Sequence, residues 1–424
     1  MDIVIYTNME EKILVELIKE ENKWWRGKFE VAGYKERHIH KEISKFIKQR
    51  QIIALTGLRR VGKTTLMFKI IEEKIEKKFP KENIFYFSFD EFSDIRIREL
   101  IRLYENIINK DISEGNFVIV FDEIQKVMNW EEQLKRIYDN YPNIKFIISG
   151  SESLFIRKKS RESLAGRIFE FKMNPLSFKE YLIFRGKLFD NLILYREEIL
   201  KEFKKYLICN GFPELIGKDR NFILKYIQQN IIEKIIFSDL PVIFEIKNIS
   251  VLKSVFNIIY NNPGQIIEVQ ELAKEIGISR HTLSDYLEYL EKAFLIKKLY
   301  NFSKNIRKTE RRLKKYYPTI INPYVINTDF SKAFENILVM ELHAEFFYRD
   351  SFKNEVDIVQ IKEGRKETLP IEIKSGKIKS RDIKPVKIFQ KRFKSKKGII
   401  ISYDIKDTLN GIKIIPFYEY LLKK

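Results

Sequence analysis

A short segment bounded by glycines constrains this chain more than any other feature of its sequence. It fits the pattern G-x-x-x-x-G-K-[ST] at every fixed position, and it lies between an apolar β-type run at 51–56 and a helical pattern at 63–78. Glycines at both ends let backbone N–H groups wrap a phosphate, and the helix start adds a favourable dipole. The segment and the residue after it are Gly57, Leu58, Arg59, Arg60, Val61, Gly62, Lys63, Thr64 and Thr65. We therefore predict a phosphate-binding loop; the alternative is a chance match, which the strand and the helix on either side disfavour.

The end of this loop and a second apolar run predict ATP and Mg²⁺ as cofactors. Lys63 should reach the β- and γ-phosphates, and the Thr64 hydroxyl should ligate Mg²⁺. The run at 117–121 ends in Asp122 and Glu123. One carboxylate at a strand end can hold the Mg²⁺ shell and the next can polarise the attacking water, so Asp122 takes the first role and Glu123 the second. The alternative for this pair is a helix N-cap with an acidic first turn.

Polar and basic residues further along the chain are candidates for contact with the γ-phosphate. The strand-like run at 145–150 has Ser149 next to its last residue and Ser151 just beyond it, where a phosphate sensor would lie. Arg167 could stabilise charge on the γ-phosphate in this subunit or in a neighbour. An ordinary surface arginine is the alternative for that position.

Strands and helices alternate through the first part of the chain. Strand-like runs at 83–89, 117–121 and 145–150 are separated by helical patterns at 95–110 and 130–140. Such alternation predicts a parallel sheet covered on both faces, so the expected fold class is α/β. The 424 residues are too many for one ordinary core and indicate two or three domains.

Charge and cysteine content limit the classes of partner. The formal net charge is +20, which attracts phosphate polymers such as DNA, although surplus lysine also serves surface solubility. The single cysteine, Cys209, excludes an intrachain disulfide and a thiolate metal cluster and indicates a reducing compartment. No signal peptide is recognisable in 1–20, and no run approaches 18 apolar residues. We expect a cytoplasmic protein with no membrane partner.

Several motifs taken together carry a family resemblance that covers nearly the whole chain. They are G-L-R-R-V-G-K-T-T-L from 57, F-D-E-I-Q at 121–125, S-G-S at 149–151, L-A-G-R at 164–167 and N-P-L-S-F at 174–178. In these the chain resembles the prokaryotic AAA-type ATPases of the archaeal ATPase/DUF4143 group. The resemblance implies an ATPase core followed by a winged-helix module and a nuclease-like C-terminal region.

A helix-turn-helix pattern lies at 271–287. Gly277 suits the turn and Ser279 suits the cap of the second helix, while 295–299 is typical of the first strand of a wing. In DNA-binding proteins the second helix enters the major groove, and a nearby basic segment at 303–315 could meet phosphates. The base-reading candidates are Ser279, Arg280, His281, Thr282 and Ser284. The alternative is a structural lid or a subunit contact, since acidic side chains share that helix.

Carboxylates near the C-terminal end form a third candidate site. Asp357 lies in a strand-like run at 355–361, and Glu372 and Lys374 lie in another at 368–374. Two or three carboxylates can bind Mg²⁺ or Mn²⁺, and a lysine can orient the attacking water. A helical acid, Glu341 or Glu335, could add a further ligand, whereas Lys374 is not a ligand. The pattern resembles the PD-(D/E)xK nuclease core; the alternative is a nuclease-derived docking domain.

The expected organisation has four parts. They are an ATPase core with N-terminal helices at 1–172, a helical lid at 173–250, a winged-helix-like module at 251–315 and a restriction-endonuclease-like α/β domain at 316–424. The expected activity is Mg²⁺-dependent ATP hydrolysis on or near DNA. Two alternatives stay open, namely a nucleotide-dependent switch that holds a protein partner and an ATP-coupled, metal-dependent DNA endonuclease. The sequence leaves the oligomeric state undetermined.

Overall fold

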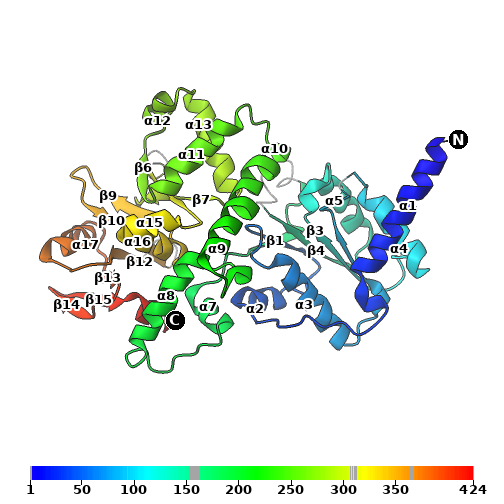
Figure 1. The fold of residues 1–424 in the computed structure, drawn as a ribbon, viewed down its shortest axis with the longest axis horizontal. Coiled ribbons are helices and arrows are strands. Elements are labelled where there is room, and N and C mark those ends of the chain that lie inside the picture. The colour runs from blue at the N-terminus through cyan, green and yellow to red at the C-terminus, as the bar shows by residue number, and fades with distance from the viewer. Residues whose placement is uncertain are drawn as a thin grey trace. The chain divides into compact units, whose positions relative to one another are not determined.

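A computed structural model gives the architecture of the protein (Figure 1). It describes residues 2–92, 94–151, 163–305, 307, 309, 313–362 and 367–423. The chain forms two compact units, Met1–Asn174 and Pro175–Lys424. The first unit ends close to the expected boundary at 172, and the further division of the second unit into three parts stays a prediction. Within the described ranges, no helix combines the length and the apolar character that a membrane span requires.

The first unit is built on a five-stranded sheet in the order β2-β3-β4-β1-β5. All four strand pairings are parallel, which confirms the α/β fold class predicted for this part of the chain. The strands are β1 (Ile52–Thr56), β2 (Ile84–Ser88), β3 (Phe117–Asp122), β4 (Ile144–Gly150) and β5 (Ile168–Lys172). Every residue of β1 and β3 is buried, as continuous apolar strands of a parallel sheet require.

Helices cover both faces of this sheet (Figure 1). The long helices are α1 (Asp2–Glu21), α3 (Lys63–Glu76), α4 (Ile97–Ile108) and α5 (Trp130–Asn140); the shorter ones are η1 (Lys23–Trp25), α2 (His38–Ser44), η2 (Lys81–Asn83) and η3 (Ile124–Lys126). Side chains of α1, α4 and α5 share one apolar core with alternate residues of the strands. The helix α3 packs on the opposite face, where Phe68 meets the ring of Tyr86.

The edge strand β2 is closed by side chains from the end of α1 and from η1. The buried Asn22 amide accepts a hydrogen bond from the Tyr86 N–H at 2.8 Å and donates to the Tyr86 carbonyl at 2.8 Å. Both indole N–H groups of Trp24 and Trp25 donate to the Ile84 carbonyl, at 3.1 and 2.9 Å. An asparagine side chain thus replaces a neighbouring strand and protects an edge that would otherwise be open to pairing.

Replacing Asn22 by Ala should therefore weaken the first unit by about 1–3 kcal/mol, because it leaves the buried Tyr86 N–H and carbonyl without partners. All three tryptophans of the chain, Trp24, Trp25 and Trp130, lie in this unit, so tryptophan fluorescence during denaturant unfolding reports on it alone. The exposed Asn116→Ala is the matched control and should leave the midpoint unchanged. Equal midpoints for both variants would show that Asn22 does not hold the edge.

Helices dominate the first half of the second unit. They are α7 (Phe178–Phe184), α8 (Arg196–Cys209), η4 (Pro213–Leu215), α9 (Arg220–Tyr226), the π-helical η5 (Ile227–Glu233) and η6 (Ile235–Asp239), α10 (Leu240–Ile243), α11 (Ile249–Asn261), α12 (Val269–Ile276) and α13 (Arg280–Lys292). Later helices are α15 (Pro323–Thr328), α16 (Phe330–Glu341), α17 (Ser380–Phe393) and α18 (Phe417–Leu422). The helical character expected for 173–250 is therefore present.

Two further five-stranded sheets belong to the second unit, in the orders β10-β9-β7-β8-β6 and β11-β12-β13-β15-β14. The strands of the first sheet are β6 (Gln265–Ile267), β7 (Ile296–Asn301), β8 (Lys314–Pro318), β9 (Phe346–Arg349) and β10 (Glu355–Val356). Those of the second are β11 (Ile358–Lys362), β12 (Glu367–Lys374), β13 (Ile399–Ser402), β14 (Asp407–Leu409) and β15 (Ile412–Pro416). Both sheets mix parallel and antiparallel pairs.

The single strand expected at 355–361 is in fact two strands in two different sheets. β10 pairs with β9, whereas β11 pairs with β12. Asp357 lies at the bend between them, where the chain passes from one sheet to the other. This corrects the expectation that Asp357 lies within a strand, and it places the carboxylate at a junction to which both sheets contribute side chains.

Candidate functional site

The phosphate-binding loop connects the end of β1 to the start of α3, as the sequence predicts. Gly57 has φ of +141°, and a Cβ built there would lie 2.1 Å from the Met173 carbonyl oxygen. Gly62 has φ of +98° and immediately precedes α3. Both backbone conformations strain any residue with a Cβ, and the close approach to Met173 leaves no room for a side chain at the first position. The two glycines of the motif are thus required by geometry.

The remaining loop residues divide into buried and exposed positions. Leu58 and Val61 are buried, whereas Arg60, in the left-handed region, and Thr65 are exposed, and Arg59 is half-buried. Lys63 is buried and its ammonium donates to the carbonyls of Gly57 and Leu58, each at 3.0 Å. The lysine therefore lies folded across the loop that precedes it, with its positive charge at the end of β1.

Thr64 and Asp122 meet across the end of the sheet. The Thr64 hydroxyl donates to Asp122 Oδ2 at 2.6 Å, although the strands that precede them, β1 and β3, are separated by β4. Asp122 is also bonded to the Ser149 hydroxyl of β4 and to the Tyr86 hydroxyl of β2, the latter at 3.1 Å. Burial, followed by the charge of the neighbouring Glu123, raises the pKa of Asp122 above its ordinary value. A hydroxyl and a carboxylate in contact are the donor set that Mg²⁺ takes in nucleotide sites, so these residues fit the ion.

Glu123 follows Asp122 directly, and its backbone is in the left-handed conformation, with φ of +51°. Its backbone N–H donates to the Ser149 hydroxyl at 3.3 Å, and its carboxylate accepts from the Gln125 side chain at 2.6 Å. Gln125 also approaches the Ser151 hydroxyl at 3.4 Å. Glu123 occupies the position before the short helix η3 without a side-chain capping bond, so capping does not account for its carboxylate.

Three residues that contact this site were not anticipated from the sequence. Tyr86 and Gln125 bond the two acidic residues, and Arg37 donates to the carbonyls of Val61 and Asn174 at 3.0 and 2.9 Å. Arg37 is buried, and it ties the chain before β1 to the middle of the loop. Gln125 lies inside the F-D-E-I-Q motif, so a signal existed for it, whereas Tyr86 and Arg37 belong to no motif in the sequence.

Arg167 is held by an acidic residue of α5. Its guanidinium donates to the two carboxylate oxygens of Asp139 at 2.8 and 3.1 Å, and this bond raises the pKa of the arginine. This ion pair is compatible with the alternative, an ordinary surface arginine. Its expected action on a γ-phosphate stays a prediction.

The helix-turn-helix region of the second unit has the local geometry that its sequence predicts. Gly277 has φ of +79°, and the Ser279 hydroxyl caps α13 by accepting from the Thr282 N–H at 3.0 Å. Arg280, His281 and Ser284 are exposed on α13, and His281 lies 3.2 Å from Asp285. The hairpin of β7 and β8 follows this helix, and β8 pairs on its other side with β6.

One residue of the basic segment at 303–315 is placed contrary to expectation. Residues 306, 308 and 310–312 lie outside the described residues. Lys315, at the end of the segment, is only 4% exposed, and it points away from solvent into a group of carboxylates. It is therefore not available to a phosphate of DNA. The cause is the burial of β8, in which residues 315–318 are all buried, so that Lys315 lies in the interior of the second unit.

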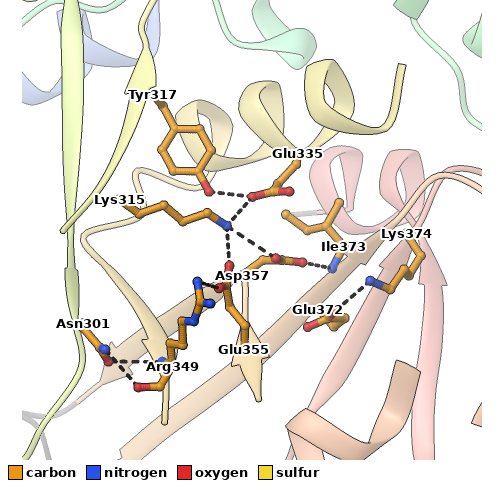
Figure 2. Close-up of polar contacts among 10 residues, drawn as sticks. All are labelled: Asn301, Lys315, Tyr317, Glu335, Arg349, Glu355, Asp357, Glu372, Ile373 and Lys374. Carbon is orange, nitrogen blue, oxygen red and sulfur yellow. Dashed lines mark hydrogen bonds and ion pairs between the residues drawn. The ribbon is translucent and has the colours of Figure 1, made fainter. Parts of the chain in front are cut away.

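The C-terminal candidates Asp357, Glu372 and Lys374 come together as the sequence predicts (Figure 2). Asp357 Oδ2 accepts from the Ile373 N–H at 2.8 Å, and Lys374 donates to Glu372 Oε1 at 2.7 Å. Glu372 Oε2 is buried and has no hydrogen-bond partner among the described residues. Burial and then the charge of Glu335 raise the pKa of Asp357 to about 7. Burial and then the charge of Asp357 raise the pKa of Glu372 well above its ordinary value.

Glu341, the helical acid assigned to this cluster, lies elsewhere. It accepts hydrogen bonds from the Phe178 N–H at 2.9 Å and from the Tyr206 hydroxyl, and burial raises its pKa to about 7. The alternative acid, Glu335, does lie at the cluster, where it contacts Lys315 at 2.8 Å. The two acids are six positions apart on α16, which is not a whole number of helical turns, so they point in different directions. Among the described residues, no three Asp, Glu, His or Cys side chains are arranged to hold a metal ion.

Models of known protein families match three successive parts of the chain. Residues 49–182 match the family model of an AAA domain, residues 200–319 match a domain of unknown function (DUF8612), and residues 331–420 match another (DUF4143). The chain thus carries an AAA domain followed by a DUF4143 domain. The resemblance noted in the sequence is confirmed, and the loop, Thr64, Asp122 and Ser149 all belong to the AAA domain.

Relatives extend over nearly the whole chain. An uncharacterized protein of Methanocaldococcus jannaschii, MJ1544, is 29% identical over 450 residues, which cover 98% of this chain and 96% of the relative. A second from the same organism, MJ1637, is 27% identical over 91% of this chain and 88% of its own length. Among solved structures, the Walker-type ATPase of Pyrococcus abyssi shares 14% identity over 70% of this chain and 97% of its own, with a TM-score of 0.44. At that TM-score the likeness assigns neither fold nor function.

The geometry of Gly57 in the AAA domain makes a direct prediction. Gly57→Ala should weaken nucleotide binding at least about tenfold, a change of about 1.4 kcal/mol, because the new Cβ would displace the loop from Met173. A fluorescent ATP analogue titrated against the full chain measures the effect. Gly27→Ala is the matched control, since a Cβ at Gly27 meets nothing within 4 Å. Unchanged affinity in Gly57→Ala would contradict the assignment of this loop to phosphates.

Proposed function

We propose that the AAA domain binds ATP with Mg²⁺ and hydrolyses it. The observation that carries the proposal is the 2.6 Å hydrogen bond between the Thr64 hydroxyl and Asp122, at the mouth of a glycine-bounded loop. These two groups would hold Mg²⁺, which when bound supplies positive charge opposite the phosphate oxygens. Lys63 would leave the carbonyls of Gly57 and Leu58 and bind the β- and γ-phosphates instead.

Residues next to Asp122 would activate the water that attacks the γ-phosphate. Glu123 would accept a proton from the attacking water, and the Gln125 amide, which donates to it at 2.6 Å, would fix its orientation. The Ser149 hydroxyl donates to Asp122 and accepts from the Glu123 backbone N–H. It would therefore fix the position of the metal-holding residue relative to the water-activating one. Burial of Asp122 supports this division of roles, because a dry site strengthens charge–charge interactions.

A DNA partner is supported by several features of the second unit. The Ser279-capped helix α13 carries exposed Arg280 and His281, and a helix, a short strand, two helices and a β-hairpin follow one another in the order of a winged helix. The strand order β7-β8-β6 has the third strand of this module between the other two. With a net charge of +20, the chain as a whole favours binding to a polyanion.

Two substitutions separate binding from turnover. Lys63→Ala should abolish ATP binding, whereas Glu123→Gln should keep ATP binding and lower the rate of hydrolysis about 10²-fold or more, because only the proton acceptor is lost. The exposed Glu114→Gln is the control and should hydrolyse like the wild type. Phosphate release measured with and without duplex DNA at low salt gives the rates, and DNA should raise the wild-type rate.

Equal hydrolysis by Glu123→Gln and the wild type would refute the role of Glu123. If the wild type binds ATP without measurable turnover and shows no DNA affinity at low salt, the nucleotide-dependent protein-binding switch is the better account.

A second candidate function rests on the pairing of Asp357 and Glu372 next to Lys374. Residues from the bend before β11 and from β12 bring two carboxylates and a lysine together, and Glu372 Oε2 lacks a partner among the described residues. Two carboxylates can hold one Mg²⁺ or Mn²⁺, the remaining ligands being water. Lys374 would orient the water that attacks a phosphodiester. We infer a metal-dependent DNA endonuclease activity for this site.

Nicking of supercoiled plasmid in the presence of Mn²⁺ tests this candidate. Asp357→Asn and Glu372→Gln should abolish nicking, since each removes one of the two ligands. Lys63→Ala should nick DNA like the wild type, because the ATP site is separate in sequence and lies in the other unit. Nicking that survives in Asp357→Asn would point to a contaminating nuclease and contradict the assignment.

A further inference from the structure

Lys315 has an unusual setting for a lysine. Its ammonium lies 2.8 Å from Glu335 Oε1, 2.7 Å from Glu355 Oε1 and 3.8 Å from Asp357 Oδ1 (Figure 2). These acids come from α16, from β10 and from the bend after β10, whereas the lysine comes from β8. Burial alone would lower the pKa of Lys315, but the surrounding carboxylates raise it well above its ordinary value. The lysine is therefore a permanent cation inside the cluster.

The side chain of Lys315 has little freedom to leave. Gly264, with φ of +79°, lies against it, and a Cβ at that position would come within 3.3 Å of Lys315 Cε and 3.1 Å of the Tyr317 ring. The Tyr317 hydroxyl donates to Glu335 Oε1 at 2.6 Å, so the same oxygen is bonded by both residues. The absence of a side chain at Gly264 thus makes room for Lys315. The hydroxyl of Tyr317 holds Glu335, which is bonded to the lysine.

Two carboxylate oxygens at Asp357 and Glu372 remain for another cation. Asp357 Oδ2 is occupied by the Ile373 N–H, and its Oδ1 has only the 3.8 Å contact with Lys315. Glu372 Oε1 is occupied by Lys374, while Oε2 is buried and without a partner in the described part of the chain. The cluster therefore has three carboxylates around one ammonium and, separately, one buried carboxylate oxygen without a hydrogen-bond partner among the described residues.

We propose that the ammonium of Lys315 takes the place of one divalent cation in this cluster, so that the site accepts a single metal ion, at Asp357 and Glu372. The ammonium contacts Glu335 and Glu355 at 2.8 and 2.7 Å and lies 3.8 Å from Asp357, so its charge already occupies the space among these three acids. This inference rests on the second candidate function, whose metal site it deepens. Lys315 is a specificity-determining residue, because it sets how many divalent ions the cluster can hold.

Electrostatics predicts that loss of the Lys315 charge raises the affinity of the cluster for divalent cations. A unit positive charge about 4 Å from a binding oxygen opposes a divalent cation strongly even at a high effective dielectric. Removing the charge while keeping the length of the side chain, as in Lys315→Met, should free Glu335, Glu355 and Asp357 for an ion. Loss of the shared cation also destabilises the folded variant, although Glu355 keeps its 3.4 Å contact with Arg349, and a divalent cation should restore that stability.

The experiment is a Mn²⁺ titration of the nucleotide-free full chain, read by the electron paramagnetic resonance signal of free Mn²⁺, with a thermal melt at each Mn²⁺ concentration. Lys315→Met should bind one more Mn²⁺ per chain than the wild type, or bind it at least about tenfold more tightly. Its melting temperature should rise more with Mn²⁺ than that of the wild type. Adding Asp357→Asn to Lys315→Met should remove the gain.

Lys298→Met is the matched control, because Lys298 lies on the adjacent strand β7 and pairs with Glu291 at 2.7 Å outside the cluster. It should bind Mn²⁺ like the wild type. Equal Mn²⁺ stoichiometry and affinity in Lys315→Met and the wild type, with equal thermal shifts, would overturn the inference even if wild-type binding is abolished by Glu372→Gln. Wild-type binding that Asp357→Asn and Glu372→Gln leave intact would instead overturn the second candidate function.

Discussion

The hydrogen bond between Thr64 and Asp122 depends on one constraint, namely that parallel strands end at the same edge of their sheet. β1 and β3 are not neighbours, yet both end where β4 also ends, so the hydroxyl at the start of α3 reaches the carboxylate that terminates β3. Ser149 of β4, the strand between β1 and β3, also bonds Asp122. A different strand order, or one antiparallel strand among the three, would separate these groups. The nucleotide-binding geometry is thus a direct consequence of the sheet topology.

Much of this arrangement could be predicted from the sequence because the decisive signals are local. The glycine pattern, the apolar runs before Gly57 and Asp122, and the helical period after Lys63 each depend on neighbouring residues only. The edge strand β5 was not predicted, because its side chains are mostly half-buried or exposed and show no continuous apolar run. The buried strands carry a strong hydrophobic signal, and the edge strand does not.

The contacts that the sequence did not reveal depend on tertiary packing. Lys315 was grouped with a basic segment, but its position in β8 turns it towards three acids from other elements. Glu341 and Glu335 are equally plausible in sequence, and only the orientation of α16 decides that Glu335 joins the cluster. Arg37 reaches the phosphate-binding loop through a fold that brings distant residues together. The spacing of residues along the chain does not predict these contacts.

The most direct test of the account is a crystal structure of the full chain with Mg²⁺ and a non-hydrolysable ATP analogue. The account predicts that the Thr64 hydroxyl ligates Mg²⁺ at about 2.0–2.1 Å, with Asp122 in its shell. It also predicts that the Lys63 ammonium has left the carbonyls of Gly57 and Leu58 for the β- and γ-phosphates. A nucleotide bound away from the loop, or Mg²⁺ held without Thr64 and Asp122, would contradict it.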